Sequence, residues 1–367
     1  MPHSISRPNW VQIDLAALQH NARVLARHAA PARLVAVIKA GAYGHGAPEV
    51  ARALESVPEV AMLGVASVDE AILLRENGVF APILLLSALL PAEASAVVKW
   101  NLTPTVWTSQ LAFALSQAQG DNGTLKVHFK VDTGMNRLGA DWCEAKQAFE
   151  EVSAFKNLEI AAVYTHFACA DEESELTQTQ LHRFRAFCAE VEPASGVLKH
   201  AANSAGTLRF PAAHFDLVRP GIALYGAHPC HELGPALDLR PVMSWKAQIT
   251  VLRSVKAGQS VSYGAHFVAP RDMCVAVVPV GYADGYLRAL SNRGEVLIRG
   301  AKCRVLGRVT MDQIMIYVSA INAHIGDEVL IWGQDLPVEE VAQHAGTISY
   351  ELLCAVSSRV PRVYVHC

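Results

Sequence analysis

The sequence is poor in charge, and neither sign is in excess. Only 18% of its 367 residues are Asp, Glu, Lys or Arg, whereas about 25% is usual in globular proteins. The formal net charge is −3, and the lysines and arginines form no long run. We therefore expect no nucleic-acid partner and no attachment to an anionic membrane. Hydrophobic residues make up 51% of the chain, which excludes general disorder and favours a large buried core.

Segments that direct a chain into or across a membrane are also missing. The first residues carry no apolar stretch of the signal-peptide kind. The longest apolar run, residues 79–92, contains two prolines and is shorter than the roughly 20 residues that a spanning helix needs.

The eight cysteines form no Cys-x-x-Cys pair, as expected of reduced thiols in a cytoplasmic protein. No fourth partner accompanies His228, Cys230 and His231, so we predict no metal site.

Eight short apolar runs alternate with amphipathic helical segments over about the first 230 residues. Continuous apolar runs are typical of parallel strands that are buried on both faces. Ser67 and Glu70 indicate a capping box at the start of one intervening helix. The pattern predicts the α/β fold class, with a (β/α)8 barrel of the TIM type in preference to a doubly wound open sheet. The runs cover residues 34–40, 61–67, 81–88, 102–107, 125–134, 160–167, 198–206 and 216–226.

The pattern changes after about residue 235. Alternating apolar and polar residues, separated by glycine-containing turns, predict a mainly antiparallel β domain with one helix near residues 337–344. We therefore expect a barrel of residues 1–235 and a C-terminal β domain of residues 236–367. The alternating runs cover residues 242–258, 273–285, 294–309, 314–320 and 327–333.

The segment AVIKAGAYGHG, residues 36–46, places Lys39 at the end of a predicted strand. In a barrel, the carboxyl ends of the strands face the active site. Partial desolvation there favours the neutral, nucleophilic amine that Schiff-base chemistry needs. Lys39 is therefore a candidate nucleophile, although a lysine at a strand end can also simply reach solvent.

Polar residues also follow the other predicted strands. Ser204 and Gly221 follow strands seven and eight, where barrels commonly bind phosphate through backbone N–H groups and a hydroxyl. Arg219 lies beside them and is otherwise explained by a surface ion pair. Arg137 follows strand five in a polar loop that suits a carboxylate ligand. His166 ends strand six; a lone histidine is usually a core residue, but this one has other strand-end polar groups as neighbours.

Four motifs in the second domain place chemically versatile residues where we expect turns between strands. Taken singly, these tyrosines are as well explained by edge or core positions. The motifs are SVSYGAHF with Tyr263, VGYADGYLR with Tyr282, RVTMDQ with Met311 and Asp312, and ISYELLC with Tyr350.

Eight motifs, in order and over essentially the whole chain, resemble those of bacterial alanine racemases. They are VIKAGAYGHG, KVDTGMNRLG, HAANSAG, VRPGIALYG, SYG, VGYADGY, GRVTMDQ and ISYELLC. The resemblance implies a barrel with a β domain, a pyridoxal 5'-phosphate (PLP) cofactor, and interconversion of L-alanine and D-alanine. It also implies a homodimer with shared active sites, which supplies D-alanine for the cell wall or degrades it.

The resemblance further implies a role for individual residues. Lys39 forms the imine with PLP and is the base on one face of the substrate, and Tyr263 of the neighbouring subunit is the base on the other. Arg219 bonds to the pyridine nitrogen, and His166 links it to Tyr263. Tyr43, Ser204, Gly221, Ile222 and Tyr350 hold the phosphate. Arg137 and the backbone at Met311 bind the substrate carboxylate, and Asp312 lies nearby. Tyr282 narrows the entrance to the site. Lys130 matches a lysine that is carbamylated in some members.

Two positions depart from the family pattern: Gly41 replaces the usual Asn or Asp, and Ser87 stands where Gly is common. Three other functions compete with alanine racemisation. A non-catalytic PLP-binding barrel would not need the domain that carries Tyr263. A PLP decarboxylase is expected to place an acid, not Arg219, against the pyridine nitrogen. A racemase that prefers serine or accepts many amino acids remains open, because one extra hydroxyl changes discrimination only modestly.

Overall fold

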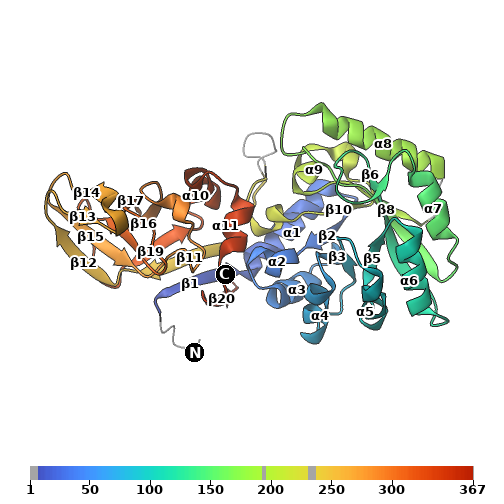
Figure 1. Cartoon of the computed structure of the whole chain (residues 1–367), viewed down its shortest axis with the longest axis horizontal. Coiled ribbons are helices and arrows are strands. Elements are labelled where there is room, and N and C mark those ends of the chain that lie inside the picture. The colour runs from blue at the N-terminus through green and yellow to red at the C-terminus, as the bar shows by residue number, and fades with distance from the viewer. Residues whose placement is uncertain (1–6, 192–195, 230–236, 367) are drawn as a thin grey trace.

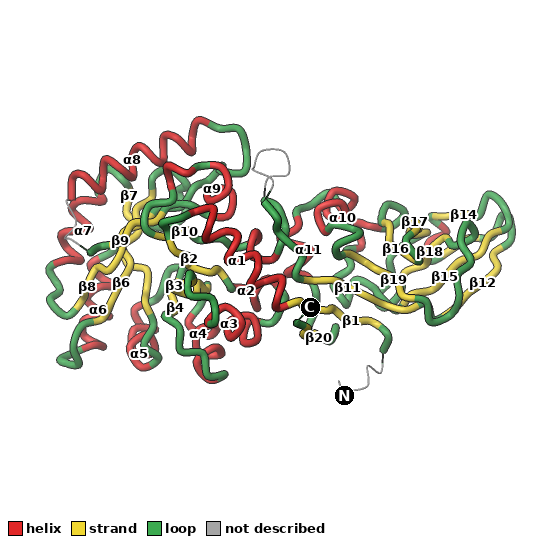
Figure 2. Tube along the Cα trace, turned by 180° about the vertical axis from the view of Figure 1, so that it is seen from behind, coloured by secondary structure: helices red, strands yellow, loops and turns green. Residues whose placement is uncertain are grey.

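The computed structural model describes residues 7–191, 196–229 and 237–366. Figure 1 shows two lobes along the long axis of the molecule, a barrel and a β-rich domain. In Figure 2 the helices of the barrel surround its strands, whereas strands dominate the other lobe. No helix in the described part of the chain is long and apolar enough to span a bilayer.

Eight parallel strands of the described chain form the closed barrel that the sequence predicts. A pairing between the fourth and fifth of these strands and another between the first and last close the ring, which excludes the open sheet. The strands are β2 (Arg33–Val37), β3 (Val60–Val65), β4 (Ile83–Leu85), β5 (Thr103–Val106), β6 (Leu125–Asp132), β8 (Leu158–Tyr164), β9 (Leu198–His200) and β10 (Leu217–Val218). The short β7 (Ala140–Asp141) pairs with the end of β6.

Helices connect the barrel strands, and several begin at the caps that their sequences provide. Ser67 caps its helix as predicted, but the carboxylate of Glu70 instead accepts hydrogen bonds from the backbone of Ala66 and Ala40. It thereby ties the ends of the first two barrel strands together. The helices are α1 (Leu15–Ala29), α2 (Lys39–Tyr43), α3 (Ala47–Glu55), α4 (Val68–Glu76), α5 (Ala94–Lys99), α6 (Ser109–Gln119), α7 (Ala145–Ser153), α8 (Glu175–Val191) and α9 (Ser204–Arg209).

The second domain is mainly antiparallel, as predicted. Its nine described strands follow the order β12-β15-β18-β17-β16-β19-β11-β1-β20, and the only parallel pair among them is β1 with β20. Their bounds are β1 (Asn9–Asp14), β11 (Met243–Gln248), β12 (Val251–Val255), β15 (Met273–Val278), β16 (Glu295–Ile298), β17 (Ala301–Leu306), β18 (Ile314–Tyr317), β19 (Glu328–Trp332) and β20 (Arg362–Val365). A separate hairpin consists of β13 (Ser260–Val261) and β14 (Phe267–Val268).

Two features of this domain differ from the sequence interpretation. Strand β1, assigned by sequence to the barrel, lies between β11 and β20 in the second sheet. The division expected between residues 235 and 236 lies outside the described residues. A second helix, α11 (Ser349–Ala355), follows α10 (Val338–Ala345) where a turn was predicted for Tyr350. The buried residues of α11 are Ser349, Leu352 and Leu353, whose spacing is that of one helical face.

Candidate active site

A cavity of about 450 Å³ opens at the carboxyl ends of the barrel strands. It brings together side chains from segments that lie far apart in the sequence, as barrel topology requires. Nine of the predicted site residues line it: Lys39, Tyr43, Lys130, Arg137, His166, Ser204, Arg219, Gly221 and Tyr350. Ile222 follows the lining residue Gly221 and is fully buried, and Ser87 is part of the lining.

Lys39 precedes a left-handed turn that holds the next four residues in an uncommon conformation. The φ angles of Ala40, Gly41, Ala42 and Tyr43 lie between 53° and 61°. Each non-glycine residue in this conformation costs roughly 1–2 kcal/mol, and such strain is typical of functional sites. A Cβ at Gly41 would meet no atom within 4 Å, so the glycine and the family's usual Asn or Asp suit the same backbone.

The environment of Lys39 differs from the expectation in one respect. Its side chain is exposed in the single chain, whereas the sequence argument expects partial desolvation. The turn after it nevertheless folds Tyr43 back into the same cavity, where the Tyr43 ring lies 4.9 Å from the Tyr225 ring. Burial raises the pKa of Tyr43, so its phenol is a neutral hydrogen-bond donor. Desolvation of Lys39 requires a further surface over the cavity.

The loops after β9 and β10 form a tight backbone cradle. The Ser204 hydroxyl accepts a hydrogen bond of 2.8 Å from the Gly221 N–H. A Cβ added to Gly221 would lie 2.4 Å from the Tyr43 hydroxyl, so only glycine fits here without a shift. The first turn of the short helix η3 (Ile222–Tyr225) follows at once. Hydroxyls, closely approachable backbone and a helical N-terminus together suit the oxygens of a phosphate.

Arg219 is almost fully buried, and no carboxylate of the described chain contacts it. Its guanidinium donates to the carbonyls of Thr165 and Ala201 and to Nδ1 of both His200 and His166. Burial lowers the pKa of Arg219 to about 10, which leaves it cationic at neutral pH. Burial and this cation hold the pKa of His166 well below its usual range. His166 is therefore neutral, and its proton lies on Nε2 because Nδ1 accepts from Arg219.

Lys130 lies in β6 against the face of Tyr164, with Nζ 4.7 Å from the ring centre. Burial, together with the charges of Arg219 and Arg137, lowers the pKa of Lys130 to about 7. A substantial fraction of its amine is then neutral at physiological pH. The neutral amine is the form that can add CO2, and the resulting negative carbamate would face two arginines.

This pKa predicts a pH-dependent stability that replacing Lys130 with methionine should remove. Below pH 7 both the folded and the unfolded state carry the proton, so the cost of burying the charge is present in full. Between pH 7 and about 10 the unfolded state binds more protons, and the free energy of unfolding should rise by about 1.4 kcal/mol for each pH unit. Urea unfolding of the cofactor-free protein in CO2-free buffer measures this slope. The exposed Lys156, changed to methionine, is the control, and an unchanged slope in the Lys130 variant would contradict the assignment.

Among the predicted residues of the second domain, Tyr350 lines this cavity within one chain, whereas Tyr263, Tyr282, Met311 and Asp312 do not. Tyr263 lies between β13 and β14 in the turn η4 (Tyr263–Ala265), and its side chain is 72% exposed. Figure 1 shows that hairpin at the end of the β domain farthest from the barrel. Tyr282 and Met311 are also exposed. Their loops pack together, since Ala283 N–H donates to the Met311 carbonyl at 3.0 Å.

Asp312 and the buried Asp284 anchor this surface. Arg359 donates to the Asp312 carboxylate at 2.7 Å and also contacts Asp284. Arg7 forms a two-point contact with Asp284 and donates to the Asp312 carbonyl. The Asp312 carboxylate thus forms an ion pair with Arg359 that fixes the loop carrying Asp312. Asp284 was not singled out from the sequence, although it is the D of VGYADGY.

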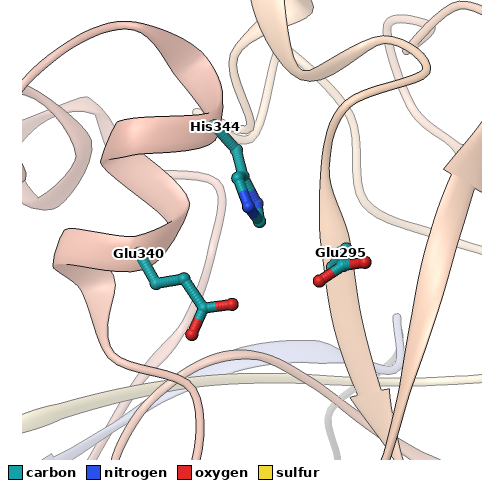
Figure 3. Close-up of side chains that lie close together, drawn as sticks. All are labelled: Glu295, Glu340 and His344. Carbon is teal, nitrogen blue, oxygen red and sulfur yellow. The ribbon is translucent and has the colours of Figure 1, made fainter.

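One group in the described residues has the composition of a metal site. Glu340 and His344 of α10 point toward Glu295 of β16 (Figure 3), and their ligand atoms lie within 4.8 Å of one another. Lys302 already pairs with Glu340 at 2.5 Å and supplies a positive charge there. The group belongs to the β domain and does not line the barrel cavity.

Several residues that shape the cavity were missed from the sequence. Tyr164 and Asn203 line it, and Tyr164 stacks on the ring of His200 at 4.5 Å. His200 in turn contacts His128. For His128 and His200 the sequence did contain a signal, because each histidine lies within a predicted strand. A histidine in a strand is usually interpreted as a core residue. The further lining residues are Val37, Ala40, Leu86, Leu138 and Cys354.

Known proteins resemble the chain over its full length. Residues 13–229 match the family model described as "Alanine racemase, N-terminal domain", and residues 242–364 match "Alanine racemase, C-terminal domain". Alanine racemase of Desulfovibrio desulfuricans is 44% identical over 99% of both chains. The crystal structure of the biosynthetic alanine racemase from Pseudomonas aeruginosa has a TM-score of 0.90 at 38% identity, covering 98% of this chain and 100% of that one. The alanine racemase structure from Streptomyces lavendulae gives 0.92 at 36% identity, covering 99% and 98%. The chain belongs to the alanine racemase family.

Proposed function

We propose that the protein is a PLP-dependent alanine racemase that interconverts L-alanine and D-alanine. The observation that carries this proposal is the buried, cationic Arg219 in a cavity that also holds Lys39 and the Ser204–Gly221 cradle. A carboxylate at this position would hold a proton on a pyridine nitrogen, as a decarboxylase is expected to need. An arginine can only donate a hydrogen bond to that nitrogen and does not protonate it. The ring then takes less of the negative charge that forms at Cα, which favours racemisation.

The residues of the cavity fit PLP. Tyr43, Ser204, Gly221, Ile222 and Tyr350 hold the phosphate, and the missing Cβ of Gly221 leaves room for its close approach. Arg219 faces the pyridine nitrogen, and Lys39 provides the amine for the covalent attachment. When bound, the cofactor would supply an electron sink for the charge that remains at Cα after proton removal.

Racemisation requires a base on each face of the substrate. Lys39 takes and returns the proton on the face of D-alanine, and Tyr263 does so on the face of L-alanine. The N–H at Nε2 of His166 stabilises a Tyr263 phenolate by hydrogen bonding, and the positive charge of Arg219 supports it through Nδ1. Arg137 and the backbone at Met311 bind the substrate carboxylate.

The two bases come from two copies of the chain. Tyr263 lies in the turn between β13 and β14, and this hairpin is at the tip of the β domain, the end farthest from the barrel of its own subunit (Figure 1). A head-to-tail homodimer places this tip over the cavity of the second copy, where it also covers the exposed Lys39. The exposed residues Tyr282 and Met311 lie on the same β domain. In the homodimer they reach the cavity of the second copy together with Tyr263, and Tyr282 narrows its entrance.

Borohydride reduction tests the function and its first residue together. The purified protein is expected to be yellow and to racemise alanine faster than serine. Reduction should trap the cofactor on Lys39, and peptide mapping should find the pyridoxyl group there. Lys39→Ala should lose the label, and its activity should fall by at least about 10²-fold because a base is lost as well. Label on Lys130, or faster turnover of serine, would contradict the assignment.

A further inference from the structure

Two buried histidines lie behind Arg219 in the barrel interior. His200 ends β9, His128 lies in β6, and both are 2% exposed or less. His200 Nε2 lies 3.1 Å from His128 Nδ1, and Arg219 Nη1 lies 2.8 Å from His200 Nδ1. Neither ring lines the cavity as the structure describes it. A chain of hydrogen bonds therefore runs from the cavity floor into the core.

The chemistry of the three groups fixes the direction of every bond in this chain. A guanidinium can only donate, so His200 Nδ1 must accept. Burial and the charge of Arg219 lower the pKa of His128 to about 3 and that of His200 well below its usual range, so both rings are neutral. A neutral imidazole carries one N–H, which on His200 must be at Nε2. His128 Nδ1 must then be the acceptor, and its own proton lies on Nε2.

We propose that His128 is a positioning residue that fixes the tautomer of His200 and thereby the orientation of Arg219. The proposal rests on the proposed contact of Arg219 with the pyridine nitrogen. Without an acceptor at position 128, the Nε2–H of His200 is buried without a partner. The tautomer of His200 that carries its proton on Nδ1 is then no longer disfavoured. In that tautomer two hydrogen-bond donors face each other, the Nδ1–H of His200 and an N–H of Arg219. Arg219 responds by turning away from the ring nitrogen.

Two substitutions of His128 distinguish its role as a hydrogen-bond acceptor from its role in packing. In His128→Asn the side-chain oxygen replaces Nδ1 as acceptor, whereas His128→Leu fills similar space without one. We expect His128→Leu to lower kcat for racemisation by about 10- to 100-fold, the size expected for a buried unpaired donor. KM for alanine should stay near that of the wild type, because Arg137 and Met311 are unchanged. His128→Asn should restore kcat to within a few-fold.

Phe129→Leu, in the same strand and also buried, is the control for lost packing. It is expected to lower thermal stability without lowering kcat. Equal kcat in the Asn and Leu variants, or an equal loss in the Phe129 variant, would overturn the role of His128.

Neutron diffraction of the wild-type holoenzyme in deuterated solvent tests the tautomers without any substitution. Deuterium should be found on Nε2 of both His200 and His128, and on neither Nδ1. Deuterium on Nδ1 of either ring would overturn the proposal even if the Leu variant does not fold. Failure of the wild-type enzyme to racemise alanine would instead contradict the proposed function, so the two failures are distinguishable.

Discussion

Tyr263→Phe is expected to lose racemisation in both directions while retaining exchange of the Cα proton of D-alanine. Lys39 and the phosphate cradle are intact in this variant, so the substrate still binds. Lys39 can take the proton from D-alanine and return one to the same face. Racemisation should fall by about 10²- to 10⁴-fold in both directions, because the phenol acts as a general base and the overall equilibrium cannot change. Exchange of L-alanine should fall as steeply.

Proton NMR in deuterated solvent measures the exchange of each enantiomer, and a chiral assay measures racemisation. The same change at Tyr317, whose hydroxyl accepts from Arg271 in the β domain, is the matched control and should leave both rates unchanged. Equal residual exchange of both enantiomers by the Tyr263 variant would indicate one mobile base, and the assignment of the two faces would be abandoned.

Mixing two inactive variants, Lys39→Ala and Tyr263→Ala, is expected to restore activity. In a mixed head-to-tail dimer, one cavity carries both changes and the other carries neither. Random exchange of equal amounts should therefore restore about one quarter of the wild-type activity, because half of the dimers are mixed and half of their sites are intact. Neither variant alone should exceed about 10⁻² of the wild-type rate.

Subunit exchange is followed independently with two affinity tags. Lys39→Ala mixed with differently tagged Lys39→Ala is the control and should remain inactive. Exchange without recovery would show that Lys39 and Tyr263 do not act in one shared site.

The predictable part of this molecule consists of residues at strand ends. Lys39 and Arg219 are far apart in the sequence, yet both follow barrel strands, and barrel closure brings all carboxyl ends of the strands to one rim. Recognising the strands was therefore enough to gather most of the cavity. Its chemical meaning came from the resemblance of whole motifs, since each residue alone had an ordinary structural explanation.

The rest depends on register and tertiary packing, which a sequence pattern does not report. His128 follows a register shift in the pairing of β6 with β8, so counting along the strand does not show which way its ring points. Tyr263 is presented by a turn in which Ser262 and Ala265 have positive φ angles. The Ser262 hydroxyl reaches the Arg308 carbonyl, and such long-range bonds sustain a conformation that local propensity disfavours.

Strand β1 also imposes an order on biosynthesis. It leaves the ribosome before any part of the barrel, but both of its partners, β11 and β20, are translated after the last barrel strand. Its backbone donors and acceptors must stay unpaired while the barrel is completed, and an unpaired strand is a template for misplaced pairing. The nine-stranded sheet of the β domain is complete only when residues 362–365 emerge, because β20 is an edge strand of this sheet. A ribosome that stalls before residues 362–365 emerge thus yields a finished barrel tethered to a sheet without its edge strand β20.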